Sequence, residues 1–544
     1  MSDIPALDQV AREAARRRTF AIIAHPDAGK TTLTEKLLLK GGAIQLAGAV
    51  RAKGNARRTR SDWMKIEQDR GISVATSVMT FERDGMVFNL LDTPGHEDFS
   101  EDTYRTLTAV DAAVMVLDAA KGIESQTRKL FEVCRLRDIP IVTFVNKMDR
   151  EARDPFDLIE EIQQTLALDA APVAWPVGRA SSFWGTYDIL ARRLMPVDAT
   201  EDAGIAVDGP DDPRIAALVG EERATQLSED ILLAEAGLNT FDLERFREGT
   251  LTPVYFGSAL RDFGVGHLLE GLADFAPPPG QRQADRRPVL PAEEKLTGFV
   301  FKVQANMDPN HRDRVAFVRL CSGRLTKGMR LRQVRTGKQV PVNAPLFFFA
   351  KERQVAEEAW PGDVVGIANH GTLRIGDTLT EGEDINFRGV PSFAPEILRH
   401  VRLGDPMLAK KLRTALDQLA EEGVVQVFRP LDGSPPVVGV VGQLQLDVLK
   451  SRLAFEYGVP AGFDETRWQT MRWISAPASA SAADDRAAIE RWATGNRGDT
   501  ATDHDGEYVA LFGSDWRRKR AEEEYPALRF DAVREQSGLV AMVR

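Results

Sequence analysis

The chain has 544 residues, well above the ~100–200 residues of a usual domain, so its length predicts roughly three domains. With 43% hydrophobic and 28% charged residues, its composition is that of a globular protein that can bury sizeable cores. A net charge of −11 argues against a protein that coats nucleic acid, and no apolar run approaches the ~20 residues needed to cross a bilayer.

The two cysteines, Cys134 and Cys321, lie far apart and in unlike sequence contexts. A disulfide framework or a zinc site needs closely patterned cysteines, so both residues are interpreted as buried thiols. We expect a cytoplasmic protein with no membrane association.

The first predicted strand, residues 19–24, leads into a loop suited to binding phosphate. Residues 24–31 read Ala-His-Pro-Asp-Ala-Gly-Lys-Thr, and helical spacing follows them. Gly29 permits a close approach of backbone N–H groups to phosphate oxygens, Lys30 supplies a neutralising charge, and Thr31 offers a hydroxyl to Mg²⁺. Phosphate loops usually open with glycine, where this chain has alanine.

A polar segment without strong periodicity follows, and it contains Arg70-Gly71-Ile72-Ser73. Such a segment can be ordered by a γ-phosphate with its Mg²⁺ and released after hydrolysis. Ser73 is therefore a candidate metal ligand in the GTP-bound state only. The alternative is a serine in a turn or at a strand edge.

The next predicted strand with a motif, residues 87–91, ends in the sequence Asp-Thr-Pro-Gly-His at 92–96. The carboxylate of Asp92 can hold Mg²⁺ through water, and the amide of Gly95 can reach a γ-phosphate. His96 is the predicted catalytic residue, because a side chain beside that glycine can orient the attacking water. The alternative is a simple turn begun by an aspartate.

A strand predicted at 139–145 precedes the sequence Asn-Lys-Met-Asp at 146–149. Guanine presents an N1–H and an amino group along one edge, and a single carboxylate accepts both. Adenine lacks this pair of donors. Asp149 is therefore expected to select guanine, while Asn146 and Lys147 brace the loop.

A strand at 253–256 leads to a Ser-Ala-Leu segment, which we expect to close the base pocket with a backbone amide. The complete set of predicted GTP contacts is Ala24, His25, Pro26, Asp27, Ala28, Gly29, Lys30, Thr31, Asp92, Thr93, Pro94, Gly95, His96, Asn146, Lys147, Met148, Asp149, Ser258, Ala259 and Leu260.

The order of patterns predicts three kinds of domain. Strands that alternate with helices favour a doubly wound parallel sheet with the motifs at the carboxyl ends of strands, hence an α/β P-loop GTPase domain over 1–280 with a helical insertion at about 198–250. Short alternating strands favour an all-β barrel over 281–388. Mixed patterns favour an α+β domain over 389–544.

Residues 281–350 hold fourteen Lys and Arg against five Asp and Glu. Two interpretations stay open, a solvated barrel surface and a face that meets ribosomal RNA.

The motifs resemble those of the translational GTPases, and within that family the chain is similar to the release factor 3 group. In this family the phosphate loop reads Ala-His-x-Asp-x-Gly-Lys-Thr, so the opening Ala24 is usual there, and Ser73 fits the release factor 3 group. The similarity rests on residues 61–64, 70–73, 97–107, 304–309, 421–423 and 426–430.

The resemblance implies a ribosome-stimulated GTPase that uses GTP/GDP and Mg²⁺, with Asp27 near the phosphates. It implies that the protein promotes the departure of codon-reading release factors after peptide release, without codon specificity, through contacts with ribosomal RNA and ribosomal proteins. We also expect a monomer. The chain has no Gly-Gly-Gln tripeptide, so nothing suggests that it cleaves peptidyl-tRNA itself.

Three other functions are weighed against this one. An elongation-factor or ribosome-protection relative would carry further domains. A GTP-dependent scaffold with negligible turnover would not need His96, and an ATP-using phosphotransferase is opposed by Asp149. No arginine finger is evident in the sequence, so slow turnover without a partner is expected.

Overall fold

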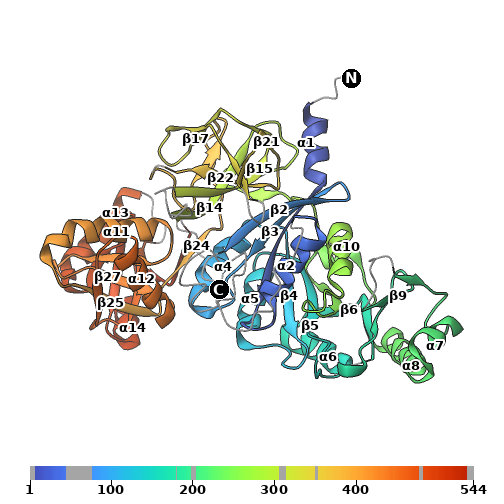
Figure 1. Cartoon of the computed structure of the whole chain (residues 1–544). Coiled ribbons are helices and arrows are strands. Elements are labelled where there is room, and N and C mark those ends of the chain that lie inside the picture. The colour runs from blue at the N-terminus through green and yellow to red at the C-terminus, as the bar shows by residue number, and fades with distance from the viewer. Residues whose placement is uncertain are drawn as a thin grey trace.

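The computed structural model describes residues 6–43, 76–178, 180–197, 204–305, 314–348, 353–369, 371–476 and 482–535. An α/β domain, an antiparallel β domain and an α+β domain follow one another along the chain, which confirms the predicted fold class (Figure 1). Ser73 lies outside the described residues, as do the rest of 70–73, residues 61–64 and residues 306–309. Within the described ranges no helix is long and apolar enough to span a membrane.

The sheet of the first domain has seven strands in the order β2-β3-β1-β4-β5-β11-β6. Its strands are β1 (Arg17–Ala24), β2 (Ser77–Arg83), β3 (Met86–Asp92), β4 (Ala112–Asp118), β5 (Ile141–Asn146), β6 (Asp169–Pro172) and β11 (Leu251–Phe256). The sequence predicts a parallel sheet, and the strands are parallel except at one edge. There β2 pairs antiparallel with β3 through a tight hairpin. Its turn, Asp84-Gly85, has positive φ at both residues, as such hairpins require.

Helices cover both faces of this sheet, as expected for a doubly wound fold. The helices of this domain are α1 (Ala6–Ala15), α2 (Lys30–Lys40), η1 (Glu97–Phe99), α4 (Ser100–Leu107), α5 (Ser125–Arg135), α6 (Pro155–Leu166) and α10 (Val265–Phe275), and of these α2, α10, α5 and α6 pack on the faces of the sheet. Phe20 and Ile22 of β1 share a core with α2 and α10, whereas Ala21 and Ile23 share the opposite core with α5 and α6. Burial on both faces is the reason that residues 20–24 of β1 are all apolar.

The segment between β6 and β11 contains a small sheet as well as the predicted helices. A four-stranded antiparallel sheet comes first, followed by the helices. These elements are β7 (Ala174–Val177), η2 (Ala180–Ser182), β8 (Gly185–Asp188), β9 (Arg193–Pro196), β10 (Ile205–Ala206), α7 (Pro213–Val219), α8 (Glu221–Gly237) and α9 (Leu243–Arg247). The sequence prediction missed the sheet because these strands are too short to show a clear alternation.

The second domain is an antiparallel half-barrel with eight strands in the order β18-β17-β23-β14-β15-β22-β19-β20. Its strands, with the short pairs beside them, are β12 (Arg282–Gln283), β13 (Pro288–Val289), β14 (Thr297–Ala305), β15 (Arg314–Ser322), β16 (Leu325–Thr326), β17 (Met329–Gln333), β18 (Gln339–Val342), β19 (Leu346–Phe348), β20 (Arg353–Val355), β21 (Glu358–Ala359), β22 (Val364–Ala368) and β23 (Thr378–Thr380).

Most of the basic side chains noted at 281–350 are paired with carboxylates, several of them in other parts of the chain. The paired residues are Arg282, Arg286, Arg287, Lys302, Arg314, Arg319, Arg324, Lys327, Arg332 and Arg335. The local charge excess is thus largely neutralised within the molecule. This favours a solvated barrel surface over a face that meets ribosomal RNA.

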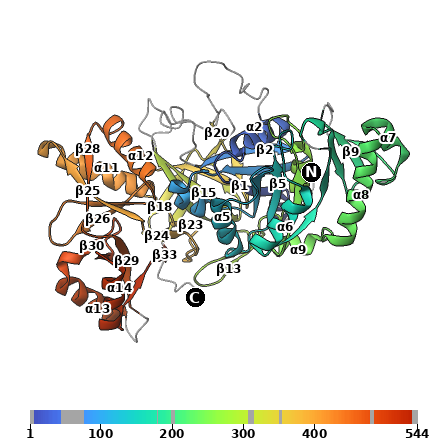
Figure 2. The ribbon, with the colours of Figure 1, turned by 90° about the horizontal axis from the view of Figure 1, so that it is seen from below.

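The third domain repeats one β-α-β-β-α-β unit, a repeat that the sequence does not show. The first unit is β25 (Ile397–Leu403), η3 (Pro406–Leu408), α11 (Ala409–Glu421), β26 (Gln426–Pro430), β27 (Val437–Val440), α12 (Gln443–Phe455) and β28 (Ala461–Glu465). The second is β29 (Thr470–Ser475), α13 (Ala482–Gly495), η4 (Arg497–Asp499), β30 (Thr500–Thr502), β31 (Tyr508–Phe512), α14 (Asp515–Glu524) and β32 (Arg529–Asp531). The joint sheet has the order β28-β25-β27-β26-β30-β31-β29-β32, and the two units form the orange and red lobes of Figure 2.

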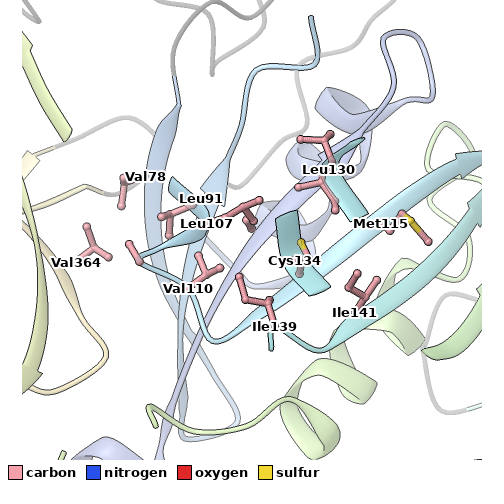
Figure 3. Packing of buried hydrophobic residues seen from close by; sticks show 14 of the residues in the cluster. Val78, Leu91, Leu107, Val110, Met115, Leu130, Cys134, Ile139, Ile141 and Val364 are labelled. Carbon is pink, nitrogen blue, oxygen red and sulfur yellow. The ribbon is translucent and has the colours of Figure 1, made fainter. Parts of the chain in front are cut away.

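Buried contacts join the first two domains. Val78 of β2 and Val364 of β22 belong to one hydrophobic cluster, which also contains Cys134 (Figure 3). Arg17 of β1 lies 2.8 Å from the carboxylate of Asp363, and both side chains are buried. The third domain is reached through β24 (Pro391–Phe393), which pairs with β33 (Val533–Glu535) and packs against α4.

Candidate guanine nucleotide site

The loop between β1 and α2 has the backbone shape of an anion-binding loop. Asp27 (φ 68°) and Gly29 (φ 98°) are both left-handed, a conformation that lets successive N–H groups form a concavity for phosphate oxygens. A Cβ at Gly29 would lie 2.2 Å from Nδ2 of Asn146, so this position needs glycine for space as well as for its φ angle.

A buried ion pair lies beside this loop. Nζ of Lys30 is 2.5 Å from Oδ1 of Asp92, and both side chains are less than one-tenth exposed. Thr31 follows in the first turn of α2. The loop thus brings together a cation for phosphate, a hydroxyl and a carboxylate, and the last two are oxygen ligands that suit Mg²⁺.

The fit of a metal ion depends on the nucleotide. Among the described residues, no three His, Cys, Asp or Glu side chains group together as a metal site. A Mg²⁺ bound by Thr31 and, through water, by Asp92 would therefore take further ligands from phosphate oxygens and water, which is the usual habit of this ion.

Gly95 and His96 lie next to the phosphate loop. A Cβ at Gly95 would lie 3.8 Å from Cε of Lys30 and 3.8 Å from Cα of Pro26, so the backbone here approaches the loop closely. The side chain of His96 is 38% exposed. Its Nδ1 accepts a hydrogen bond from the backbone N–H of Asp98 at 3.2 Å, so the neutral ring carries its proton on Nε2.

Asn146 joins three loops at the carboxyl edge of the sheet. Its Nδ2 donates to the carbonyl of Ala28 at 2.8 Å, and its Oδ1 accepts from the N–H of Ala259 at 2.9 Å. The loops after β1, β5 and β11 are thereby held together by one buried side chain. The role of Asn146 in nucleotide binding stays a prediction, and these contacts are the ones that a bracing residue would make.

Lys147 is held by a residue that the sequence analysis did not identify, Asp118 at the end of β4. Its Nζ donates to Oδ2 of Asp118 at 2.6 Å and to the carbonyl of Asp27 at 2.5 Å. Burial raises the pKa of Asp118, but hydrogen bonds from Lys147 and from nearby backbone amides outweigh burial and lower it overall. The signal for Asp118 was available, since it is a carboxylate at the end of an apolar strand in the same sheet.

The carboxylate of Asp149 is held in place by the segment after β11. Its Oδ1 accepts a hydrogen bond from Oγ of Ser258 at 2.5 Å, and that hydroxyl accepts from the N–H of Arg261 at 3.3 Å. Ser258 is buried, whereas Leu260 is 55% exposed. Two segments predicted to form the base pocket are thus in direct contact.

Some side chains of the predicted set point into the protein. Met148 lies in the hydrophobic core, and Oγ1 of Thr93 donates to the carbonyl of Ile22 at 2.7 Å. These residues support the loops through their packing. Nε2 of His25 lies 3.1 Å from Glu124, a second neighbour of the loop that sequence reasoning missed.

The chain matches three family models in the order of its domains. Residues 15–278 match the elongation factor Tu GTP binding domain, and residues 295–382 match elongation factor G domain 2. Residues 387–522 match the C-terminal domain of class II release factor RF3.

A solved structure supports the same arrangement. A crystal structure of a protein from Thermus thermophilus is 26% identical to the chain and superposes with a TM-score of 0.68. The match covers 86% of this chain and 71% of that chain.

Proposed function

This chain belongs to the translational GTPases and is of the release factor 3 type, and on that basis we propose that it acts in translation termination. In the proposed reaction, the ribosome stimulates GTP hydrolysis, and the protein promotes dissociation of codon-reading release factors after the peptide is released. The action does not depend on which stop codon is read. The proposal includes a cytoplasmic location and a monomeric state.

One observation carries the proposal. A GTP-binding domain of the elongation factor Tu type and the C-terminal domain of release factor RF3 are found in one chain, in that order. The first domain indicates that GTP is hydrolysed. The second supports termination rather than elongation as the step at which hydrolysis is used.

We assign the roles of single residues within this proposal. Lys30 neutralises phosphate oxygens, Thr31 and Asp92 hold Mg²⁺, and Asp149 accepts the two donors of guanine. When bound, Mg²⁺ supplies charge that stabilises the phosphoryl group. His96 orients the attacking water with its imidazole ring.

The proposal is tested on ribosomes that have released their peptide and retain a fluorescent codon-reading release factor. Addition of the protein with GTP should raise the dissociation rate of that factor at all stop codons. An Asp149→Asn variant should act poorly with GTP and recover with xanthosine triphosphate, which ties the effect to this nucleotide site. An unchanged dissociation rate with the wild-type protein would contradict the proposed function.

A further inference from the structure

The segment directly after His96, formed by η1 and α4, contacts both of the following domains. Asp102 pairs with Lys302 of the β domain at 3.3 Å. Arg105 forms an ion pair with Glu101 and donates to the carbonyl of Gly423 in the third domain at 3.3 Å. The catalytic motif is therefore followed by a segment that has polar contacts with both of the following domains.

Asp98, two residues after His96, contacts the third domain. Its Oδ2 accepts a hydrogen bond from the N–H of Leu444 at 2.7 Å, in the first turn of α12. This helix has 13 residues, and a carboxylate at a helix N-terminus is stabilised by the free N–H groups there.

The fit around Asp98 leaves no room for a side chain on the loop before α12. A Cβ at Gly442 would lie 2.1 Å from Cγ of Asp98 and within 2.3 Å of both carboxylate oxygens. Gly442 has an extended backbone (φ −148°), so an alanine would be tolerated by the backbone itself. The methyl group of that alanine would clash with the Asp98 carboxylate.

The same aspartate also holds the ring of His96. Nδ1 of His96 accepts from the backbone N–H of Asp98, and it lies 3.3 Å from Oδ1 of the same residue. A short chain of contacts thus runs from α12 to the Asp98 carboxylate and from the backbone N–H of Asp98 to the imidazole.

We propose that Asp98 is a positioning residue through which the third domain restrains His96. The inference rests on the role proposed above for His96. When α12 is docked, its first turn holds the side chain of Asp98. The backbone N–H of Asp98 donates to the imidazole of His96, so the ring stays bonded to η1. When the protein binds its activating partner, α12 moves away from Asp98 and η1 is released. His96 is then free to turn toward the attacking water.

The direction of the effect follows from the bonds that must break. The imidazole of His96 accepts a hydrogen bond from the N–H of Asp98, and this bond has to break before the ring can be reoriented. The contact of α12 with Asp98 stabilises the conformation in which this hydrogen bond is intact. Docking of the third domain therefore slows hydrolysis in the absence of the partner and contributes to the dependence on it.

The test is the Gly442→Ala variant of the full chain, measured by single-turnover GTP hydrolysis without ribosomes. We expect the rate to rise about five-fold or more, with the GTP dissociation constant unchanged. Gly404→Ala is the matched control, because no described atom lies within 4 Å of its added Cβ. A rate equal to that of the control, or below it, would overturn the proposal.

A double-mutant cycle shows whether the effect passes through Asp98. In an Asp98→Ala background the carboxylate that Gly442→Ala displaces is gone, so the second substitution should leave the rate unchanged. A further five-fold rise in that background would also overturn the proposal. Asp98→Ala alone supplies a second variant if Gly442→Ala does not fold.

Failure of this inference can be told apart from failure of the proposed function. If His96→Ala abolishes hydrolysis while Gly442→Ala behaves as the control, His96 acts as proposed but Asp98 does not restrain it. If His96→Ala leaves hydrolysis intact, the role of His96 itself is wrong.

Discussion

The proposed selection of guanine involves two residues from separate loops, Asp149 after β5 and Ser258 after β11. Their 2.5 Å hydrogen bond fixes the carboxylate that is proposed to accept the two guanine donors. Hydrogen bonds to a charged group contribute about 1.5–3 kcal/mol each. Removal of the charge is therefore expected to have a large effect on nucleotide choice.

We expect Asp149→Asn to weaken GTP binding by about 100-fold and to favour xanthosine nucleotides, as measured by fluorescent nucleotide titration. Glu151→Gln is the control, because this residue is exposed in the same loop. Unchanged selectivity for GTP would show that Asp149 does not contact the base.

The positions of the candidate site residues were predictable where a single loop decides their place. Asn146 and Lys30 follow from their motifs, and the structure brings them to one edge of the sheet. Asp118 and Asp98 were not singled out, because their partners, Lys147 and Leu444, are distant in sequence. The pairings themselves depend on the folded arrangement, although the place of Asp118 at the end of the apolar strand β4 was a signal in the sequence.

At the scale of elements, the small sheet of the insertion is tied to helix α10 by Asp188 at the end of β8. Its carboxylate lies 3.1 Å from Nε2 of His267 on α10 and 2.8 Å from Nε of Arg193. Burial raises the pKa of Asp188, but bonds from His267, from the backbone and from Arg193 outweigh burial and lower the pKa to about 2.

This depressed pKa predicts a pH dependence of stability. Because the folded pKa lies below the value of 3.8 for a free aspartate, the charged form contributes stability above that pH, and the contribution is lost as pH falls toward 2. We expect about 2 kcal/mol to be lost across this window. Asp188→Asn should lose it at neutral pH as well.

The measurement is acid unfolding followed by circular dichroism. Asp208→Asn serves as the control, since its side chain is 96% exposed. An Asp188→Asn profile that coincides with that of the wild type between pH 4 and pH 2 would contradict the prediction.

Helices and strands with long hydrophobic patterns were easier to predict from the sequence than short ones. The buried strands β1, β4 and β5 are largely apolar, and they occur where their sequences indicate. The four-residue strands β7 to β9 offer too few positions for a period to appear. The repeated β-α-β-β-α-β unit is a likeness of topology without likeness of sequence.

In the whole molecule, the α/β domain and the β domain are joined by buried charges. Asp111 accepts from Arg282 at 2.8 Å and from Arg319, whose side chain is only 1% exposed. Breaking a buried pair leaves an uncompensated charge in the interior. The relative placement of these two domains should therefore depend strongly on Asp111.

We expect Asp111→Ala to destabilise the protein by about 3–5 kcal/mol, as measured by the first unfolding transition in urea. Asp384→Ala is the control, because its pair with Arg286 is exposed and should contribute at most about 1 kcal/mol. Equal effects of the two substitutions would show that the Asp111 cluster does not hold the domains together.

The central claim is that His96 orients the water that attacks GTP, and single-turnover GTP hydrolysis on ribosomes by His96→Ala tests it most directly. We predict that hydrolysis falls by about 100-fold or more, because the water loses its orientation, while the GTP dissociation constant stays within about two-fold. Hydrolysis at the wild-type rate, or a loss of GTP binding itself, would contradict the account.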